Sequence, residues 1–532
     1  MSTQVESASF YTRQATGLVR EIDFTSNIAL NVSFISLPLA ALVATQAPFA
    51  FPGANIMLVV LICAVLCVFP TLLYGSLGAT MPRSGGDYVF VSRIIHPIIG
   101  FAANFNVTMW FLLVIAQFGS LLAPFGLSAA LATIGAATDN QGLIDASVTV
   151  TSKGWQFWLG AAALVATAIL VSFNLRTWTK FFVVLFFLSV VGVIIAVVLM
   201  LLNGRDDFRA ALSGFGMEYD AVIATARENG YAGGESFSWK NTIGAMPLAF
   251  ASFGYSIVST YAAGEVRAPR KTLLKALLTA LAISVAIVFI MMAVAARSFG
   301  HDFLGSITYL ANVVPDEYAL SAPPFYFFFA AMLTDSTILI AVMGVSFAIA
   351  FFVALPPTFL IATRSLFAWS FDRIIPTKVS EVNERTHSPL IANAVVLVIT
   401  LIFLAIIVYG PSEFLTLLFT AGAAELLTFI VVAIAGAVFP WRRRDLYEDS
   451  PVAGNLGAIP RMAIIGVLSA IVYVLFLVPL LINDDLGANA TPGIVAMITI
   501  ALLPFVVYGI SYAVNKSRGV DLSLTFRELP PE

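Results

Sequence analysis

Two short stretches of the chain combine serines with a proline or a glycine inside otherwise apolar sequence. Residues 31–38 read NVSFISLP, and residues 254–259 read GYSIVS. Proline lacks the amide hydrogen that a helix interior needs, and a broken helix persists in a bilayer only where protein or a cavity covers its backbone. Freed backbone groups and serine hydroxyls at such a point can hold a small zwitterion. We predict that the substrate contacts Asn31, Ser33, Phe34, Ser36, Gly254, Tyr255 and Ser256.

A single carboxylate, Glu425, lies well inside a predicted membrane span. Its sequence neighbours are alanines and leucines. A charged group at that depth is costly, so Glu425 is expected to face the interior, to pair with another group or to carry a proton. Burial favours the neutral form of a carboxyl group. We therefore predict that Glu425 couples transport to protons. The structural alternative is a neutral glutamic acid that bonds a neighbouring helix.

The composition places these residues in a membrane protein. Of the 532 residues, 60% are hydrophobic and 11% are charged, less than half the charged share of a soluble domain. The length suits about a dozen helices of about 20 residues each. The net charge of −3 argues against a nucleic-acid partner. The three histidines lie in separate loops, so the sequence predicts neither a metal site nor a cofactor.

Twelve spans account for the hydrophobic sequence. They are expected near residues 24–48, 55–80, 98–135, 155–174, 178–203, 243–265, 273–299, 335–363, 389–409, 413–439, 461–482 and 493–514. Most of the 27 Lys and Arg residues fall on the cytoplasmic side if the N-terminus is cytoplasmic. Because positive residues favour that side, we predict an integral plasma-membrane protein with both termini in the cytoplasm.

The order of the two interruptions predicts how the spans are arranged. They fall in the first and sixth spans, and because five is an odd number, the second set of five enters the membrane upside down relative to the first. The expected fold is an all-α membrane protein of twelve transmembrane helices, with a five-plus-five inverted repeat, broken helices 1 and 6, and two extra helices. The expected segments are a cytoplasmic tail (1–23), the first repeat (24–203), an extracellular loop (204–242), the second repeat (243–439), helices 11 and 12 (440–514) and a cytoplasmic tail (515–532).

Three stretches resemble motifs of one transporter superfamily. Residues 82–93 (PRSGGDYVFVSR) resemble the loop after helix 2 of the amino acid–polyamine–organocation (APC) superfamily. Residues 250–269, which end in GEVRAP, resemble its sixth helix and the following loop. Residues 362–373 (ATRSLFAWSFDR) resemble the stretch after its helix 8. The three matches follow the expected order and cover the transport core.

The resemblance implies a secondary transporter that moves an amino acid or a related small amine by alternating access. The substrate would lie between helices 1, 3, 6, 8 and 10, with Phe250 at the position of an aromatic gate. An inner gate is expected at Arg83, Asp87, Arg93 and Glu265. The lysine that many members carry in helix 5 is missing, and its position falls near Ser189. Hydroxyls of Ser189 and Ser346 could instead hold a sodium ion, so H⁺ and Na⁺ symport both stay open.

Other functional classes fit the sequence less well. Within transport, the alternative is a polyamine or organic-cation transporter or exchanger, with Glu425 as the counter-charge. An ion channel would need a repeated selectivity-filter segment, and a primary pump would need a Gly-x-x-x-x-Gly-Lys motif. Neither pattern occurs in the sequence. An enzyme would need clustered polar or metal-binding residues at one depth. We therefore predict a transporter, not an enzyme, whose partners are a small molecule and the lipid bilayer.

Overall fold

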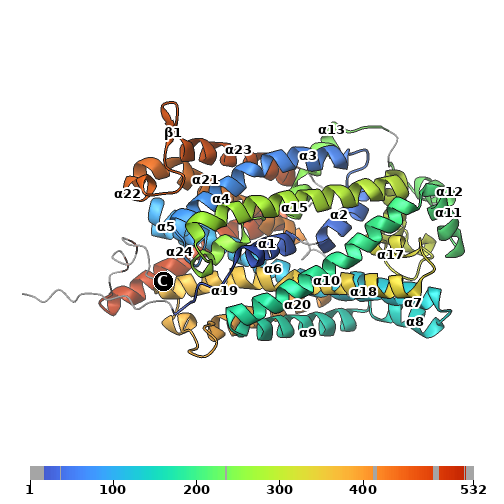
Figure 1. Cartoon of the computed structure of the whole chain (residues 1–532), viewed down its shortest axis with the longest axis horizontal. Coiled ribbons are helices and arrows are strands. Elements are labelled where there is room, and N and C mark those ends of the chain that lie inside the picture. Colours follow the sequence, from blue (N-terminus) through green and yellow to red (C-terminus); the bar gives the residue numbers. More distant parts are fainter. Residues whose placement is uncertain are drawn as a thin grey trace, which may run out of the picture.

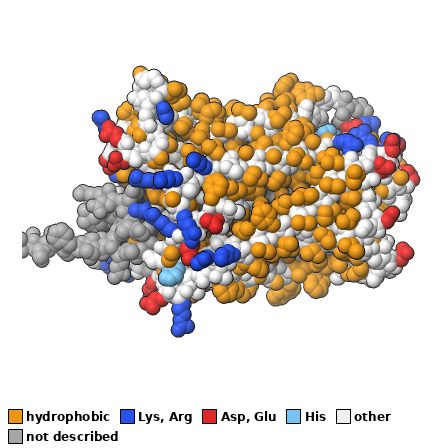
Figure 2. Space-filling view, in the orientation of Figure 1, with side chains coloured by type: hydrophobic (Ala, Val, Ile, Leu, Met, Phe, Trp, Pro, Cys, Tyr) orange, Lys and Arg blue, Asp and Glu red, His pale blue; other side chains and the backbone are white. Residues whose placement is uncertain are grey.

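The chain folds as a bundle of long helices. The computed structural model describes residues 17–35, 37–233, 236–410, 416–482 and 491–520, together with residues 522 and 526. Within these residues, 11 helices are long and apolar enough to cross a membrane. They run along the long axis of the molecule (Figure 1), and Figure 2 shows a broad band of hydrophobic side chains between two charged ends. The chain is therefore an all-α integral membrane protein.

The first part of the chain contains helices α1 to α10. Their bounds are α1 (Phe24–Ile35), α2 (Leu37–Ala50), α3 (Ile56–Leu66), α4 (Val68–Thr80), α5 (Asp87–Ile94), α6 (Pro97–Leu121), the π-helical η1 (Leu122–Ser128), α7 (Ala129–Ala137), α8 (Gln141–Thr149), α9 (Lys153–Ser172) and α10 (Leu175–Leu202). The third predicted span is thus one long rod made of α6, η1 and α7, with Pro124 in its π-helical part.

The second part begins with short helices outside the long bundle and continues with seven long ones. Their bounds are α11 (Arg205–Gly214), α12 (Tyr219–Glu228), α13 (Trp239–Gly244), α14 (Met246–Phe253), η2 (Val258–Tyr261), η3 (Ala263–Glu265), α15 (Pro269–Ser298), α16 (His301–Val313), η4 (Pro315–Glu317), α17 (Tyr326–Ala331), α18 (Thr337–Val353), α19 (Leu355–Phe371), η5 (Thr377–Ser380), α20 (Leu390–Tyr409), α21 (Thr416–Arg442), α22 (Arg444–Glu448), α23 (Arg461–Ile482) and α24 (Thr491–Ser517). A two-residue hairpin pairs β1 (Asn455–Leu456) with β2 (Ile459–Pro460) in antiparallel register.

The predicted sixth span is interrupted where the sequence predicts a break. Helix α14 ends at Phe253, and the chain then passes through a turn and two short 3₁₀ helices before α15 begins at Pro269. Gly254 fits this turn because a Cβ atom there would lie 2.2 Å from the ring of Phe250. In the first span, α1 ends at Ile35 and α2 begins at Leu37, while Ser36 lies outside the described residues.

Some predicted boundaries are wrong. Residues 362–371 do not follow a membrane helix but belong to α19, so this motif is largely helical. The span expected at 335–363 consists of α18 and α19, which are separated by a turn at Ala354. Pro356 and Pro357 follow that turn directly, where their missing amide hydrogens cost little because the first N–H groups of a helix have no partner in the helix.

An exposed apolar stripe identifies the surface that would face lipid. On α10, the side chains of Val184, Phe187, Ile194 and Leu201 are each more than half exposed. The opposite face of α10 packs on α18 and buries Phe186, Ser189 and Gly192. A continuous apolar surface of this kind is stable in hydrocarbon but not in water.

Candidate functional site

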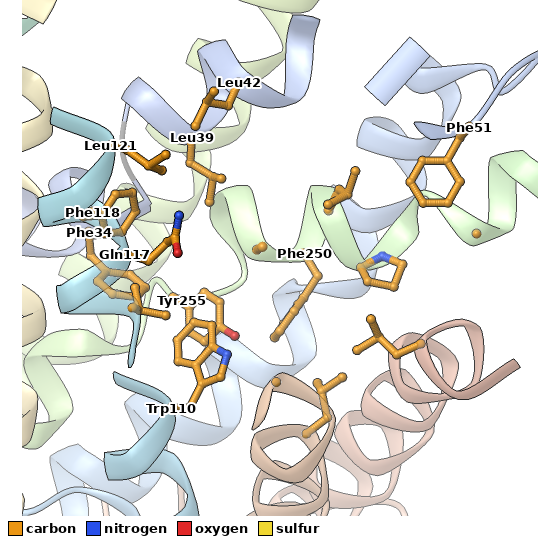
Figure 3. Close-up of a pocket in the computed structure, with 18 residues that line it drawn as sticks. Phe34, Leu39, Leu42, Phe51, Trp110, Gln117, Phe118, Leu121, Phe250 and Tyr255 are labelled. Carbon is orange, nitrogen blue, oxygen red and sulfur yellow. The ribbon is translucent and has the colours of Figure 1, made fainter. Parts of the chain in front are cut away.

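A cavity of about 280 Å³ lies beside the interruption in the sixth span. Helices α2, α6, α14, α21 and α23 contribute side chains to its wall, and Figure 3 draws the 18 residues that line it. Most of them are aliphatic or aromatic. From Tyr255 the cavity extends toward Phe51 and Gly244, near the end of the molecule where α11, α12 and α13 lie (Figure 1). Its size is at the small end of ligand pockets, which measure about 300–1,000 Å³.

Tyr255 lies at the centre of an aromatic cluster in the cavity wall. Its ring stacks on Trp110 with 5.0 Å between centroids. Phe34 packs edge-on against it at 5.1 Å, and Phe250 lies at 5.2 Å. Figure 3 shows these side chains around one space. The cluster joins α1, α6 and the break after α14, so it positions the Tyr255 hydroxyl through three separate elements.

The Tyr255 hydroxyl holds the buried carboxyl group of Glu425. It donates a hydrogen bond of 2.5 Å to Glu425 Oε2. Glu425 is 1% exposed, and its Oε1 atom has no hydrogen-bond partner in the described part of the chain. Glu425 lies on α21 between Gly422 and Leu426, which both line the cavity. The carboxyl group therefore lies directly behind the cavity wall.

Gln117 adds a polar group to the apolar wall. Its side chain projects among Phe34, Leu39 and Phe118 (Figure 3). No described residue bonds its buried Oε1 atom. Glutamine in membrane helices often serves as interhelical glue, so nothing in the sequence favours Gln117 as a ligand. Trp110 was likewise missed, since nothing local distinguishes it from a packing aromatic.

The predicted substrate residues divide into two groups. Phe34, Phe250 and Tyr255 line the cavity. Asn31 instead ties α1 to the break after α14, because its Nδ2 atom donates to Ser259 Oγ at 2.9 Å and its Oδ1 atom accepts from the Ser259 N–H at 3.3 Å. It is fully buried, so it positions α1 on the break in the sixth span.

The remaining predicted substrate residues make local contacts. Ser33 Oγ donates to the carbonyl of Ala29 at 2.6 Å, and Ser256 Oγ donates to the carbonyl of Phe253 at 3.3 Å. Gly254 caps α14 through its N–H, which bonds the Phe250 carbonyl. Ser36 lies outside the described residues.

A second, more polar cavity lies beyond the first. Phe51 lines both, and the second cavity also contacts Tyr231, His301 and Asp302. Tyr231, His301 and Asp302 come from the segments between α10 and α13 and between α15 and α18. The two segments therefore surround the approach to the apolar cavity.

The opposite end of the bundle is closed by two buried ion pairs. Arg364 on α19 bonds both oxygens of Glu265, at 2.5 and 2.8 Å. Arg93 on α5 pairs with Asp372 at 2.7 Å, and Tyr88 donates to the same carboxylate oxygen. All four charged side chains of these pairs are buried. The Arg364–Glu265 pair is bidentate, which fixes both distance and orientation. Together the two pairs link α5, η3 and the C-terminal end of α19.

The three motif stretches converge at this closed end. The Gly85 N–H bonds the Tyr261 carbonyl at 2.9 Å, and Ser84 forms an antiparallel bridge with Ala262. Gly85 has a φ of +107°, and a Cβ atom there would lie 2.6 Å from that of Ala368. The turn at 82–86 therefore needs glycine both for its backbone and for its close packing on α19.

The predicted inner-gate residues have different environments. Arg93 and Glu265 take part in the two ion pairs. Arg83 donates to the carbonyl of Pro82 at 2.9 Å. Asp87 is fully buried, and neither of its carboxylate oxygens has a hydrogen-bond partner among the described residues. The arginine and aspartate partners, Arg364 and Asp372, lie in the third motif but were not singled out from the sequence.

The C-terminal segment also reaches the closed end. The guanidinium carbon of Arg93 lies 5.0 Å from the centre of the Phe526 ring, and Phe526 is 7% exposed. Asn515 on α24 donates to the Arg373 carbonyl at 3.0 Å. No periodicity in the sequence indicates that a residue so close to the end would cover a buried ion pair.

The two serines proposed as sodium ligands belong to the contact between α10 and α18. Ser189 Oγ donates to the Phe186 carbonyl in its own helix at 2.6 Å. Gly192 lies one helical turn after Ser189 and packs against Ser346. A Cβ atom added to Gly192 would lie 2.4 Å from the Ser346 Cβ. Glu425 lies on a different helix, α21, which packs on α6 and α23.

Long apolar helices, a break after α14 and a cavity beside that break are the features of a membrane transporter. The family model described as amino acid permease matches residues 24–503. The chain belongs to the amino acid permease family of the APC superfamily. It is also similar to the branched-chain amino acid permease BcaP of Lactococcus lactis subsp. cremoris, with 23% identity over 470 residues that cover 84% of this chain and 90% of the relative.

Proposed function

We propose that this protein is a proton-coupled secondary transporter that carries neutral amino acids with bulky apolar side chains by alternating access. The observation that carries the proposal is the apolar cavity beside the interrupted sixth span, with the Tyr255–Glu425 pair in its wall. Backbone groups at the break bind the polar part of the amino acid, and the aromatic and aliphatic wall accepts its side chain. The similarity to a branched-chain amino acid permease supports this substrate class.

Glu425 is the proposed site of coupling. It is a buried carboxyl group with one bonded and one unpartnered oxygen in the described structure, so it can exist in neutral and charged forms without breaking an ion pair. The neighbouring cavity gives a proton access to it. The alternative, an organic-cation substrate that pairs with Glu425, is less favoured because the carboxyl group lies behind the wall instead of lining the cavity.

The arrangement of closed and open ends supports an outward-facing state. Buried ion pairs seal the end that contains α5 and α19, and the cavity extends toward the other end. Ile22, just before α1, bridges to Val266, and Asn515 near the end of α24 bonds Arg373, so both ends of the described chain lie at the sealed side.

We assign this side to the cytoplasm from its Lys and Arg residues, and the membrane to the plasma membrane. We count the interrupted segment as the sixth of twelve spans in a five-plus-five inverted repeat.

Uptake by proteoliposomes tests the substrate class. Purified protein should accumulate leucine, isoleucine or phenylalanine when an inward proton gradient is imposed, and should do so equally well when sodium is replaced by potassium. Lysine, glutamate and putrescine should fail to compete. Competition by putrescine would support the organic-cation alternative, uptake that requires sodium would move the coupling to another ion, and downhill flux without saturation would indicate a channel.

A cavity-filling variant sharpens this test. A Cβ atom on Gly422 would lie 3.2 Å from Trp110 Nε1, so Gly422→Leu places a side chain inside the cavity. Leucine uptake should fall about tenfold or more while alanine uptake is affected less, because the cost of overpacking falls on the larger substrate. Equal loss for both substrates would show that the side chain does not occupy this space.

A further inference from the structure

Four buried carboxyl groups lie in the described part of the chain, and they fall into two kinds. Glu265 and Asp372 each bond an arginine. Glu425 bonds the Tyr255 hydroxyl, and Asp87 has no hydrogen-bond partner in the described structure. The proposed function uses Glu425 but leaves Asp87 without a role. A buried carboxyl group with no bonded cation needs an explanation, because an unpaired buried charge is costly.

Hydroxyl and amide groups surround the Asp87 side chain. Tyr261 from η2, Tyr74 from α4 and Asn104 from α6 are its polar neighbours. The Tyr74 and Tyr261 hydroxyls are themselves buried and lack partners among the described residues. Gly86 allows the Tyr261 ring to pack close to the start of α5, since a Cβ atom at Gly86 would lie 2.9 Å from that ring. Three neighbouring buried side chains, Asp87, Tyr74 and Tyr261, therefore have polar atoms without hydrogen-bond partners among the described residues.

The charged groups on the neighbouring elements are already engaged. Arg93, on the same helix as Asp87, bonds Asp372, and Arg364 of α19 bonds Glu265. On α21 the titratable group that faces this region is Glu425, and α6 contributes the neutral Asn104. Among these groups no cation is left to neutralise an Asp87 carboxylate in the closed state.

Burial and the nearby polar groups shift the pKa of Asp87 in opposite directions. Asp87 lies between the spans Ile56–Thr80 and Pro97–Ala137. Burial raises the pKa of Asp87 to about 6, while the Tyr261 hydroxyl, its own backbone N–H, the Asn104 amide and the Tyr74 hydroxyl limit the rise. Its position in the first turn of α5 also favours the charged form. Both forms are thus accessible near neutral pH.

Tyrosines connect the surroundings of Asp87 with those of Glu425. The Tyr74 ring packs edge-on against Phe429 at 5.8 Å. Phe429 lies one helical turn after Glu425 and also contacts Tyr255, at 6.1 Å, and Tyr473, at 5.1 Å. The two unpaired carboxyl groups therefore belong to one buried region that is lined by tyrosines.

We propose that Asp87 is a second proton-binding site, which holds its proton while the cytoplasmic end is closed and loses it when that end opens. This inference rests on the proposed function. In a transport cycle, the carboxylate that the previous opening left on Asp87 takes a proton from the Glu425 carboxyl group as the gate closes. Glu425 then regains a proton through the neighbouring cavity. Opening of the gate then exposes Asp87 to water, where the charged form is stable and the proton is released. Neutral Asp87 fits the closed state, and charged Asp87 opposes it.

Cysteine labelling of the closed gate tests this proposal without any amino acid. Ser365 lies beside Arg364 and is fully buried, so a Ser365→Cys thiol reacts with a water-soluble maleimide only when the end opens. The labelling rate is measured in proteoliposomes from about pH 5 to about pH 8, in the otherwise native protein and with Asp87→Asn added. Dividing the two rates removes the pH dependence of the thiol itself. The ratio should rise about tenfold or more across this range, since only the native protein gains a charge that opposes closure.

Three tyrosine variants distinguish proton binding from a structural role. The hydroxyls of Tyr74 and Tyr261 favour the charged form, so Tyr74→Phe and Tyr261→Phe should shift the labelling midpoint to higher pH. Tyr326→Phe is the matched control, because its hydroxyl is also buried and without a partner among the described residues but lies on α17. A rate ratio that stays flat with pH, or equal shifts in all three variants, would overturn the proposal. If the ratio rises but no amino acid is transported, the proposed function fails and Asp87 remains a proton site.

Discussion

The two ion-paired carboxylates and the two unpaired ones occupy different parts of the same core. Glu265 and Asp372 bond arginines and join segments about 99 and 279 residues apart in the chain. Glu425 and Asp87 meet tyrosines and an asparagine instead. An ion-paired carboxylate holds a fixed charge and fastens two elements together. A carboxyl group among hydroxyls can gain or lose a proton and leave the packing intact. The first kind suits a gate, and the second suits coupling.

Removing an arginine from a buried pair should have the largest effect on stability. Arg364→Met leaves the Glu265 carboxylate buried without a cation and should lower the free energy of unfolding by about 3–5 kcal/mol. Thermal unfolding in detergent measures the loss. The matched control is Arg444→Gln, which breaks the exposed Arg444–Glu448 pair and should leave the melting temperature unchanged. Equal losses in the two variants would contradict the claim that the buried ion pair stabilises the fold more than the exposed one does.

Asp87→Asn should change stability in the opposite direction, and only at higher pH. The pKa of Asp87 is raised from 3.8 to about 6 in the folded protein, so the folded state binds the proton more tightly and its free energy of unfolding falls as the pH rises through this window. Asparagine carries no such cost. The variant should match the native protein at about pH 4 and exceed it by up to about 3 kcal/mol above about pH 7.

Melting temperatures across this pH range check that prediction. Asp372→Asn is a useful contrast, because it removes the charged partner of Arg93 and should destabilise the protein across this pH range. Asp87→Asn would be a structural substitution if it lowered the melting temperature at all pH values.

A smaller effect is expected where the C-terminal segment covers the ion-paired end. Phe526→Ala removes the ring that lies 5.0 Å from the Arg93 guanidinium and should cost about 1–2 kcal/mol. The Ser365→Cys labelling rate should rise modestly, because the Arg93–Asp372 pair loses its cover. Phe505→Ala, at a half-exposed ring on α24, is the control and should leave labelling unchanged. A result in which both variants behave alike would show that Phe526 adds no support to the gate.

Sequence patterns predicted the elements better than the contacts. Gly254 and Pro38 stand out because they disfavour a helix inside apolar sequence, and the structure interrupts the sixth span at Gly254. Glu425 could be found by its charge alone, since a carboxylate within a membrane span has few stable environments. The predicted span edges were less accurate where a helix runs beyond the predicted end, as α19 does to Phe371.

No local feature of the sequence predicted which residues contact each other across the bundle. Asn31 meets Ser259 across 228 residues, and Tyr255 meets Glu425 across 170. Such contacts depend on how the two halves of the bundle pack, and a single sequence does not encode that register in any periodicity. Its place in one predicted cytoplasmic loop with Arg83 and Arg93 groups Asp87 with the gate. Only the folded structure shows that Asp87 lies beside the Tyr74 and Tyr261 hydroxyls and is not paired with an arginine in the described part of the chain.

Substrate-driven proton movement tests most directly the claim that Glu425 couples transport. Proteoliposomes that enclose a pH-sensitive dye and contain no sodium are mixed with leucine, and the internal pH is followed. The native protein should acidify the lumen in step with leucine entry, and Glu425→Gln should move leucine, if at all, without acidification. Tyr255→Phe, which keeps the carboxyl group but removes its hydrogen-bond donor, should retain acidification with a shifted pH profile. Full acidification by Glu425→Gln would contradict the account.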